Sequence, residues 1–125
     1  MFDITKDKTI CITRGDVATM LVGASLQGTD PYTFAVGDVV RMQVFGKKNC
    51  ENIVMRKDVV VESETETVAL KLTGEDTKIG EIINKPVDYW YSIQLNPDTE
   101  PQTIIGYDES GEKIFRLYPE GADTL

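Results

Sequence analysis

The sequence predicts an all-β domain, an antiparallel β-sandwich of about eight strands with one short helical turn. Two observations favour strands: apolar and polar residues alternate with a period of two in several segments, and clusters of Gly, Pro and Asp separate those segments. A third observation excludes parallel crossovers, because no segment carries a long helical pattern. At 125 residues the chain is expected to form a single domain over residues 1–125, with its own apolar core.

Alternation is clearest in the segments 38–45, 67–72 and 87–95. The side chains expected to face the core there are Val40, Met42, Val44, Val68, Leu70, Leu72, Val87, Tyr89, Tyr91, Ile93 and Leu95. Further strands are expected near 8–13, 16–23, 53–62, 102–107 and 113–118. Trp90 falls on the outward face, opposite its neighbours Tyr89 and Tyr91.

Loops are expected where turn-forming residues cluster, at 27–31, 96–101 and 108–112. The last has the length of a hairpin loop of four or five residues. One helical turn is expected near 73–80, because Thr73 can cap the amides that follow and Gly80 can end the turn.

Two Gly-Asp pairs lie directly before apolar runs, in "ITRGDVATM" (residues 12–20) and in "AVGDVVRM" (residues 35–42). Gly enters positive φ without steric cost, and Asp bonds nearby backbone amides, so the pair is typical of a turn that begins a strand. Gly15, Asp16, Gly37 and Asp38 are therefore interpreted as structural turn residues. The first pair also spells Arg-Gly-Asp, a cell-adhesion ligand, but the repetition of the pattern favours an architectural role.

Composition excludes several functional classes. The formal charge is −8, from 13 basic and 21 acidic residues, and no basic patch is present, so nucleic-acid binding is not expected. No segment resembles a signal peptide or a membrane span, so the protein is expected to be made in a cytoplasm without membrane contact. Cys11 and Cys50 are expected to be reduced and buried, since they form neither a disulfide framework nor a zinc motif.

No catalytic, cofactor or metal site is expected. Histidine is absent, which leaves Cys11 without the usual base. The acidic loops 96–101 and 108–112 lack the spacing of a calcium loop. The carboxylate pairs Glu75/Asp76 and Glu64/Glu66 are interpreted as ordinary surface acids of an acidic chain.

Five segments in order, "ITRGDVATM", "FAVGDVVRMQV", "LTGEDTKIG", "YWYSIQL" and "PQTIIGYDESGEKIFRLYPEG", resemble small virion proteins of tailed phages and prophages of Gram-positive bacteria. The chain is also similar to the N-terminal domain of the phage baseplate upper protein, and the likeness covers nearly the whole chain. The resemblance implies an immunoglobulin-like sandwich and a non-enzymatic structural role in the baseplate, tail or head. Its implied partners are other phage structural proteins or copies of itself, first in the host cytoplasm and then in the virion.

Trp90 is the candidate interface residue. A sandwich buries one face of each strand, so a large ring on the other face is covered by a loop, packs at an edge or meets a partner. We expect Trp90 to lie in or beside a protein contact, most simply one with a second copy. The alternative is a carbohydrate-binding module that stacks sugars on Trp90, Tyr107 and Tyr118.

Overall fold

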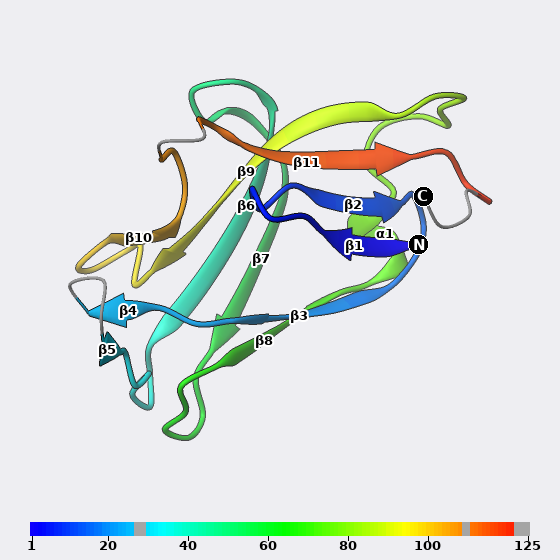
Figure 1. Cartoon of the computed structure of the whole chain (residues 1–125). Helices are drawn as coiled ribbons and strands as arrows, with labels where there is room; N and C mark the ends of the chain where they lie inside the picture. Colours follow the sequence, from blue (N-terminus) through cyan, green and yellow to red (C-terminus); the bar gives the residue numbers. More distant parts are fainter. Residues whose placement is uncertain (27–29, 109–110, 122–125) are drawn as a thin grey trace.

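The computed structural model describes residues 1–26, 30–108 and 111–121. Within these ranges the chain is mostly β-strand, with one short helix (Figure 1). The elements are β1 (Phe2–Ile4), β2 (Ile10–Thr13), β3 (Ala18–Val22), β4 (Ser25–Leu26), β5 (Asp30–Pro31), β6 (Val39–Lys47), β7 (Glu51–Val60), β8 (Val68–Leu72), α1 (Gly74–Thr77), β9 (Val87–Leu95), β10 (Gln102–Ile105) and β11 (Lys113–Tyr118). The all-β prediction is confirmed, and β1, β4 and β5 are additional to the strands expected from the sequence.

The large sheet has the strand order β1-β2-β11-β9-β6-β7, and β10 also pairs with β9. Its pairings are antiparallel except that of β11 with β2, which is parallel. The expectation of a purely antiparallel arrangement is therefore wrong for this pair. Because β2 and β11 come from opposite ends of the chain, no tight turn forces them to run in opposite directions.

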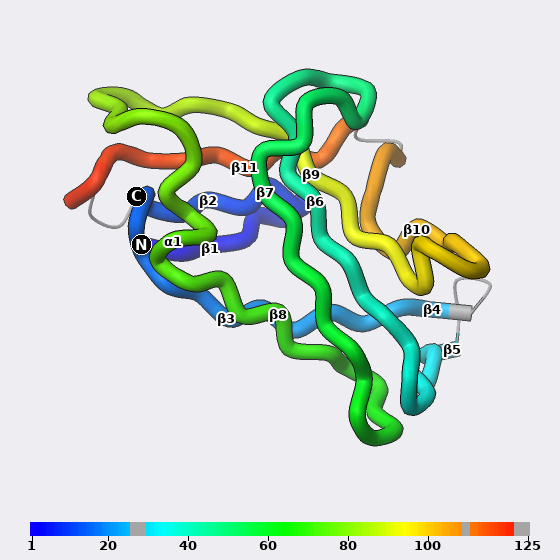
Figure 2. Tube along the Cα trace, turned by 180° about the vertical axis from the view of Figure 1, so that it is seen from behind, coloured from blue at the N-terminus to red at the C-terminus, as the bar shows by residue number. Residues whose placement is uncertain are grey.

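A smaller layer covers one face of the large sheet. Strands β3 and β8 pair with each other, as do β4 and β5. Figures 1 and 2 show β3 and β8 running together across the long strands β6 and β7. A single cluster of buried apolar side chains joins both layers, with Met20 and Leu70 from the small sheet and Met42, Ile93 and Phe115 from the large one. This cluster is the core.

The predicted inward faces are confirmed by burial. The buried members are Val40, Met42, Val44, Val68, Leu70, Leu72, Tyr91, Ile93 and Leu95. Val87 and Tyr89 are half-buried at the start of β9, and Lys71 is exposed on β8. Period-two alternation therefore identified the side of each strand that packs.

The connection between β10 and β11 differs from the expected hairpin. Both strands pair with the same edge of β9, β11 along residues 87–91 and β10 along residues 93–95, so they lie end to end rather than side by side. Among the described residues of this connection, the hairpin-like pairing is limited to an isolated antiparallel bridge between Asp108 and Gly111. Residues 27–29 and 109–110 of the predicted loops lie outside the described part of the chain.

The helical turn forms where it was predicted. Thr73 caps α1 through a reciprocal pair of hydrogen bonds: its hydroxyl accepts from the Asp76 amide, and the Asp76 carboxylate accepts from the Thr73 amide. The helix ends at Thr77, earlier than expected, and Gly80 follows with a φ of +65°.

Candidate functional site

The Arg14-Gly15-Asp16 tripeptide forms the turn between β2 and β3. The Asp16 amide donates to the Thr13 carbonyl at 3.0 Å, and Gly15 has a φ of +89° at the third position of the turn. The buried Thr77 hydroxyl holds this turn against α1, since it accepts from the Gly15 amide at 3.0 Å and donates to the Asp16 carbonyl at 2.8 Å. The tripeptide thus joins the large sheet to the small layer.

The side chains of this tripeptide are engaged inside the protein. Arg14 is only 9% exposed and donates to the carbonyls of Gly80 at 2.7 Å and Ile79 at 3.4 Å. It also forms an ion pair with Glu120 at 2.5 Å. The Asp16 carboxylate accepts from the N-terminal ammonium at 2.5 Å. An adhesion receptor would need the Arg14 guanidinium, which here is bound to the chain itself.

The second Gly-Asp pair forms the turn before β6. The Asp38 amide donates to the Ala35 carbonyl at 3.0 Å, and Gly37 has a φ of +93°. The Asp38 carboxylate accepts from the Tyr32 hydroxyl, the Ala35 amide and the Asn96 side chain, at 2.7, 2.9 and 3.1 Å. Burial would raise the pKa of Asp38, but these donors together hold it below its ordinary value.

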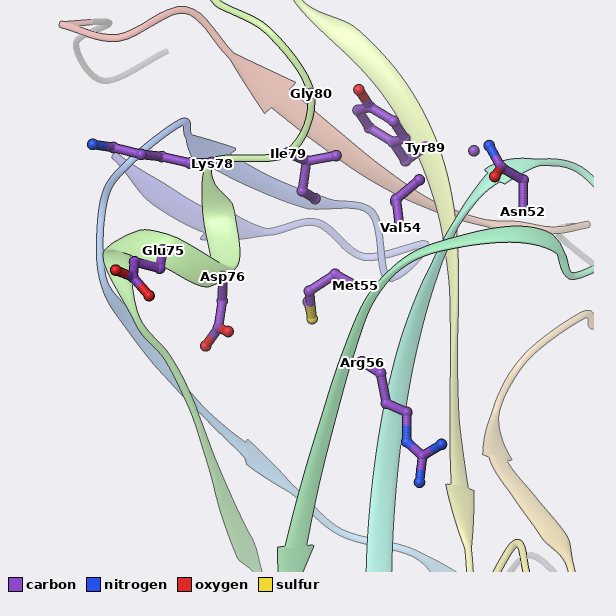
Figure 3. Close-up of a pocket in the computed structure, with 11 residues that line it drawn as sticks. Asn52, Val54, Met55, Arg56, Glu75, Asp76, Lys78, Ile79, Gly80 and Tyr89 are labelled. Carbon is purple, nitrogen blue, oxygen red and sulfur yellow. The ribbon is translucent and has the colours of Figure 1, made fainter.

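A hollow of about 670 Å³ lies between β7 and the α1 region (Figure 3). Its lining residues are Gly46, Asn52, Val54, Met55, Arg56, Glu75, Asp76, Lys78, Ile79, Gly80 and Tyr89. Asp76 is already engaged there, because it caps α1 and accepts from the Lys57 ammonium at 2.9 Å. Burial would raise the pKa of Asp76, yet its hydrogen bonds with Thr73 and Lys57 lower it overall. The carboxylate is a structural group rather than a free acid or base.

A second hollow, of about 340 Å³, opens beside Trp90 on the outer face of the large sheet. Its lining residues are Phe45, Asn49, Cys50, Trp90, Tyr91, Ser92, Gln94, Thr103, Gly106, Tyr107, Glu112 and Lys113. We call this the Trp90 hollow. It lies at the edge of β9 between the end of β10, where Ile105 pairs with Ile93, and the start of β11, where Lys113 pairs with Tyr91. The gap between those two strands creates the space.

The walls of the Trp90 hollow are aromatic and charged. Phe45 pairs with Trp90 across β6 and β9 and is 3% exposed although it points away from the core. The Lys48 ammonium lies 6.0 Å from the centre of the Trp90 ring, a cation–π contact that covers part of the ring. Tyr107 is 80% exposed at the rim. Trp90 itself is half-buried, so the rest of the chain covers its side chain only in part.

Of the three rings considered for stacking sugars, the structure brings two together. Trp90 and Tyr107 line the same hollow, whereas Tyr118 at the far end of β11 is not part of the lining. Polar groups that could accompany the rings are the side chains of Gln94 and Glu112. The sequence could not show this convergence, because β9 and the segment after β10 meet only through strand pairing.

An ionic cluster lies farther along the same outer face. The Arg41 guanidinium, 7% exposed, donates to the carboxylates of Asp58 at 2.9 and 3.2 Å and of Asp98 at 2.8 and 3.1 Å. Arg56 donates to Asp58 as well, at 3.0 and 3.4 Å. The hydrogen bonds from Arg41 hold the pKa of Asp58 and of Asp98 below the ordinary value. Asp98, from a loop considered for calcium, is thus neutralised by an arginine.

The two cysteines differ. Cys11 is buried, as expected, and burial raises the pKa of its thiol. Cys50 is exposed, so the expectation that both are buried is wrong. It sits in the loop between β6 and β7, where Asn49 and Cys50 adopt positive φ and the chain turns away from the sheet.

Within the described ranges, no three Cys, Asp or Glu side chains gather as a metal site, and no helix is long and apolar enough to cross a membrane. Comparison with protein-family models, curated proteins and solved structures gives no match.

Proposed function

We propose that the protein is a non-enzymatic structural protein of a tailed phage or prophage virion, with an immunoglobulin-like sandwich that acts through protein–protein assembly. Its partners are other phage structural proteins and copies of itself. The protein is made in the bacterial host cytoplasm and then enters the particle, in the baseplate, the tail or the head.

The observation that supports this proposal best is the Trp90 hollow. A half-buried Trp beside an exposed Tyr, with Phe45 paired to the Trp on the outer face of the sheet, is the composition of an interface centre, because Trp and Tyr are enriched among residues that dominate binding energy. Two side chains that the sequence singled out, the guanidinium of the Arg-Gly-Asp tripeptide and the Asp76 carboxylate, are instead engaged within the fold. We therefore infer that the outer face of the large sheet binds another protein.

Antibodies raised against the purified chain test the virion role. Particles released from the strain that carries the gene are purified on a density gradient and labelled with the antibody and gold. We expect label at one fixed position on the particles. Presence of the chain in the lysate but not in the purified particles would contradict the proposal.

A carbohydrate-binding role is the second candidate, because Trp90 and Tyr107 line one hollow with Gln94 and Glu112. Stacking of a sugar on an aromatic ring beside amide and carboxylate partners is compatible with this lining. Screening the chain on an array of bacterial cell-wall glycans tests it, with Tyr107→Ala as the comparison. Binding that is lost in Tyr107→Ala would favour the sugar, and the absence of any bound glycan would remove this candidate.

A further inference from the structure

Strand β7 is a long edge of the large sheet. It runs for ten residues, ends the strand order and, among the strands of the described residues, pairs with β6 alone. An edge strand presents a row of unpaired backbone donors and acceptors, which is a template for another strand. The hollow between β7 and α1 leaves space alongside this edge from Val54 to Arg56 (Figure 3).

The hydrogen bonds around β6 indicate which β7 residues carry the free groups. The Val61 amide donates to the Asp38 carbonyl, and the Asn96 amide donates to the Val39 carbonyl. In antiparallel pairs the bonded positions alternate, so residues 40, 42 and 44 of β6 bond β7, and residues 39, 41 and 43 bond β9. The β7 residues bonded to β6 are then 55, 57 and 59. Arg56, Asp58 and Val60 turn their backbone groups toward the free edge.

This alternation restricts how one β7 could pair with another. Bonded pairs across the free edge must join even-numbered residues, which leaves a small set of antiparallel registers. A register centred on residue 56 or 58 forms no pair of opposite charges, because it places Arg56 against Arg56 or Asp58 against Asp58. The register centred on Lys57 places Arg56 opposite Asp58 twice, and opposite charges directly across a pair are stabilising.

The other pairs of that register also fit. Val54 lies opposite Val60, which is 58% exposed in the single chain, and Met55 lies opposite Val59. The two Lys57 residues meet on the twofold axis, where each ammonium is already neutralised by Asp76 of its own chain at 2.9 Å. In a protein of net charge −8 this strand segment carries two cations and one anion, so two copies can approach here with little repulsion.

We propose that two copies of the chain join by antiparallel pairing of their β7 edges, centred on Lys57, into one continuous sheet. The contact is isologous, so each strand supplies the same residues to the other. It does not depend on the virion role. It leaves the Trp90 hollow, on the outer face of the sheet, open to a different molecule.

Sedimentation equilibrium of the full chain tests the contact. We expect a dimer at tens of micromolar, and a monomer at every concentration would overturn the proposal. Arg56→Asp places like charges opposite each other and should give a monomer. Lys71→Asp makes the same charge change on the exposed face of β8 and should leave the dimer unchanged. A dimer that survives Arg56→Asp, or is lost equally in both variants, would also overturn the proposal.

Disulfide trapping tests the register. In a background with Cys50→Ser, Lys57→Cys places two thiols at a non-bonded antiparallel pair, where Cα atoms lie about 4.5 Å apart and a disulfide forms without strain. We expect Lys57→Cys to give a reducible covalent dimer under mild oxidation, and Lys71→Cys in the same background to stay monomeric on a denaturing gel. Circular dichroism of each variant checks that it is folded. Failure of the folded Lys57→Cys variant to crosslink would contradict this register.

Discussion

The two faces of strand β6 are built differently. On the inner face Val40, Met42 and Val44 are fully buried against the second layer. On the outer face Arg41 and Phe45 are buried as well, outside that core cluster: carboxylates surround Arg41, and Phe45 lies in the wall of the Trp90 hollow, paired with Trp90. The inner face is therefore buried by packing between the two layers, whereas the buried residues of the outer face are held by contacts built within that face.

The largest expected effects lie on the inner face. Leu70→Ala and Tyr91→Ala should each lower the free energy of unfolding by about 2–5 kcal/mol, because each leaves a cavity in the shared core. Tyr91 also loses the bond from its hydroxyl to the Lys8 carbonyl. Chemical denaturation measures both. Lys71→Ala, on the exposed side of β8, should cost less than about 0.5 kcal/mol, and equal losses for Leu70 and Lys71 variants would contradict the face assignment.

The next largest loss of stability is expected on replacing Gly15, in the turn that joins the two layers. Gly15→Val forces a β-branched residue to a φ of +89° and should lower the free energy of unfolding by about 1–3 kcal/mol. Gly37→Val imposes the same backbone strain, but a Cβ there meets open space, whereas at Gly15 it lies 3.3 Å from the Lys78 side chain. Thermal melting should show the larger loss at Gly15. An unchanged melting temperature would reverse the interpretation of the tripeptide as a structural turn.

Phe45 is the large apolar side chain buried on the outer face of β6. Phe45→Ala should cost about 1.5–3 kcal/mol, the transfer value of the side chain, because the outer surface can relax or admit water into the space. This loss of stability is smaller than the loss on replacing an aromatic residue of the core, where the cost of the cavity adds to the cost of transfer. Denaturation of Phe45→Ala beside Tyr91→Ala measures the difference. A larger loss of stability for Phe45→Ala than for Tyr91→Ala would show that Phe45 is packed as tightly as a core residue.

The ionic cluster on the outer face predicts a dependence on pH. Since the pKa of Asp58 is lowered in the folded state, chiefly by Arg41, its stabilising effect is present above the ordinary value of 3.8 and is lost as pH falls through the folded pKa. The free energy of unfolding should therefore fall between about pH 5 and pH 3. Asp58→Asn should flatten that fall when stability is measured across this range, and an identical slope in both proteins would contradict the assignment.

Sequence patterns predicted the local features and missed those set by distant pairing. Alternation located the buried side of β6, β8 and β9, and the Thr73 cap was visible because its partner is three residues away. The parallel pairing of β2 with β11 and the burial of Arg41 depend on segments far apart in the chain. Cys50 was misassigned because a hairpin loop with positive φ has no clear signal in "KKNCEN".

The surroundings of Trp90 could not be predicted from the sequence either. The strand pattern placed Trp90 on the outer face, but the proximity of Phe45 and Tyr107 arises from the pairing of β6, β9 and β10. Neither residue is near Trp90 in sequence. A candidate interface residue could be identified from the sequence, and the surface around it could not.

Hydroxyl-radical footprinting of Trp90 shows whether the outer face of the large sheet is a protein contact in the particle. Oxidation of Trp90 and Tyr107 is measured by mass spectrometry in the free chain and in purified virions, with Tyr118, outside the hollow, as the internal reference. We expect both residues to oxidise readily in the free chain and to be protected in the particle. Equal oxidation of Trp90 in the two states would contradict it.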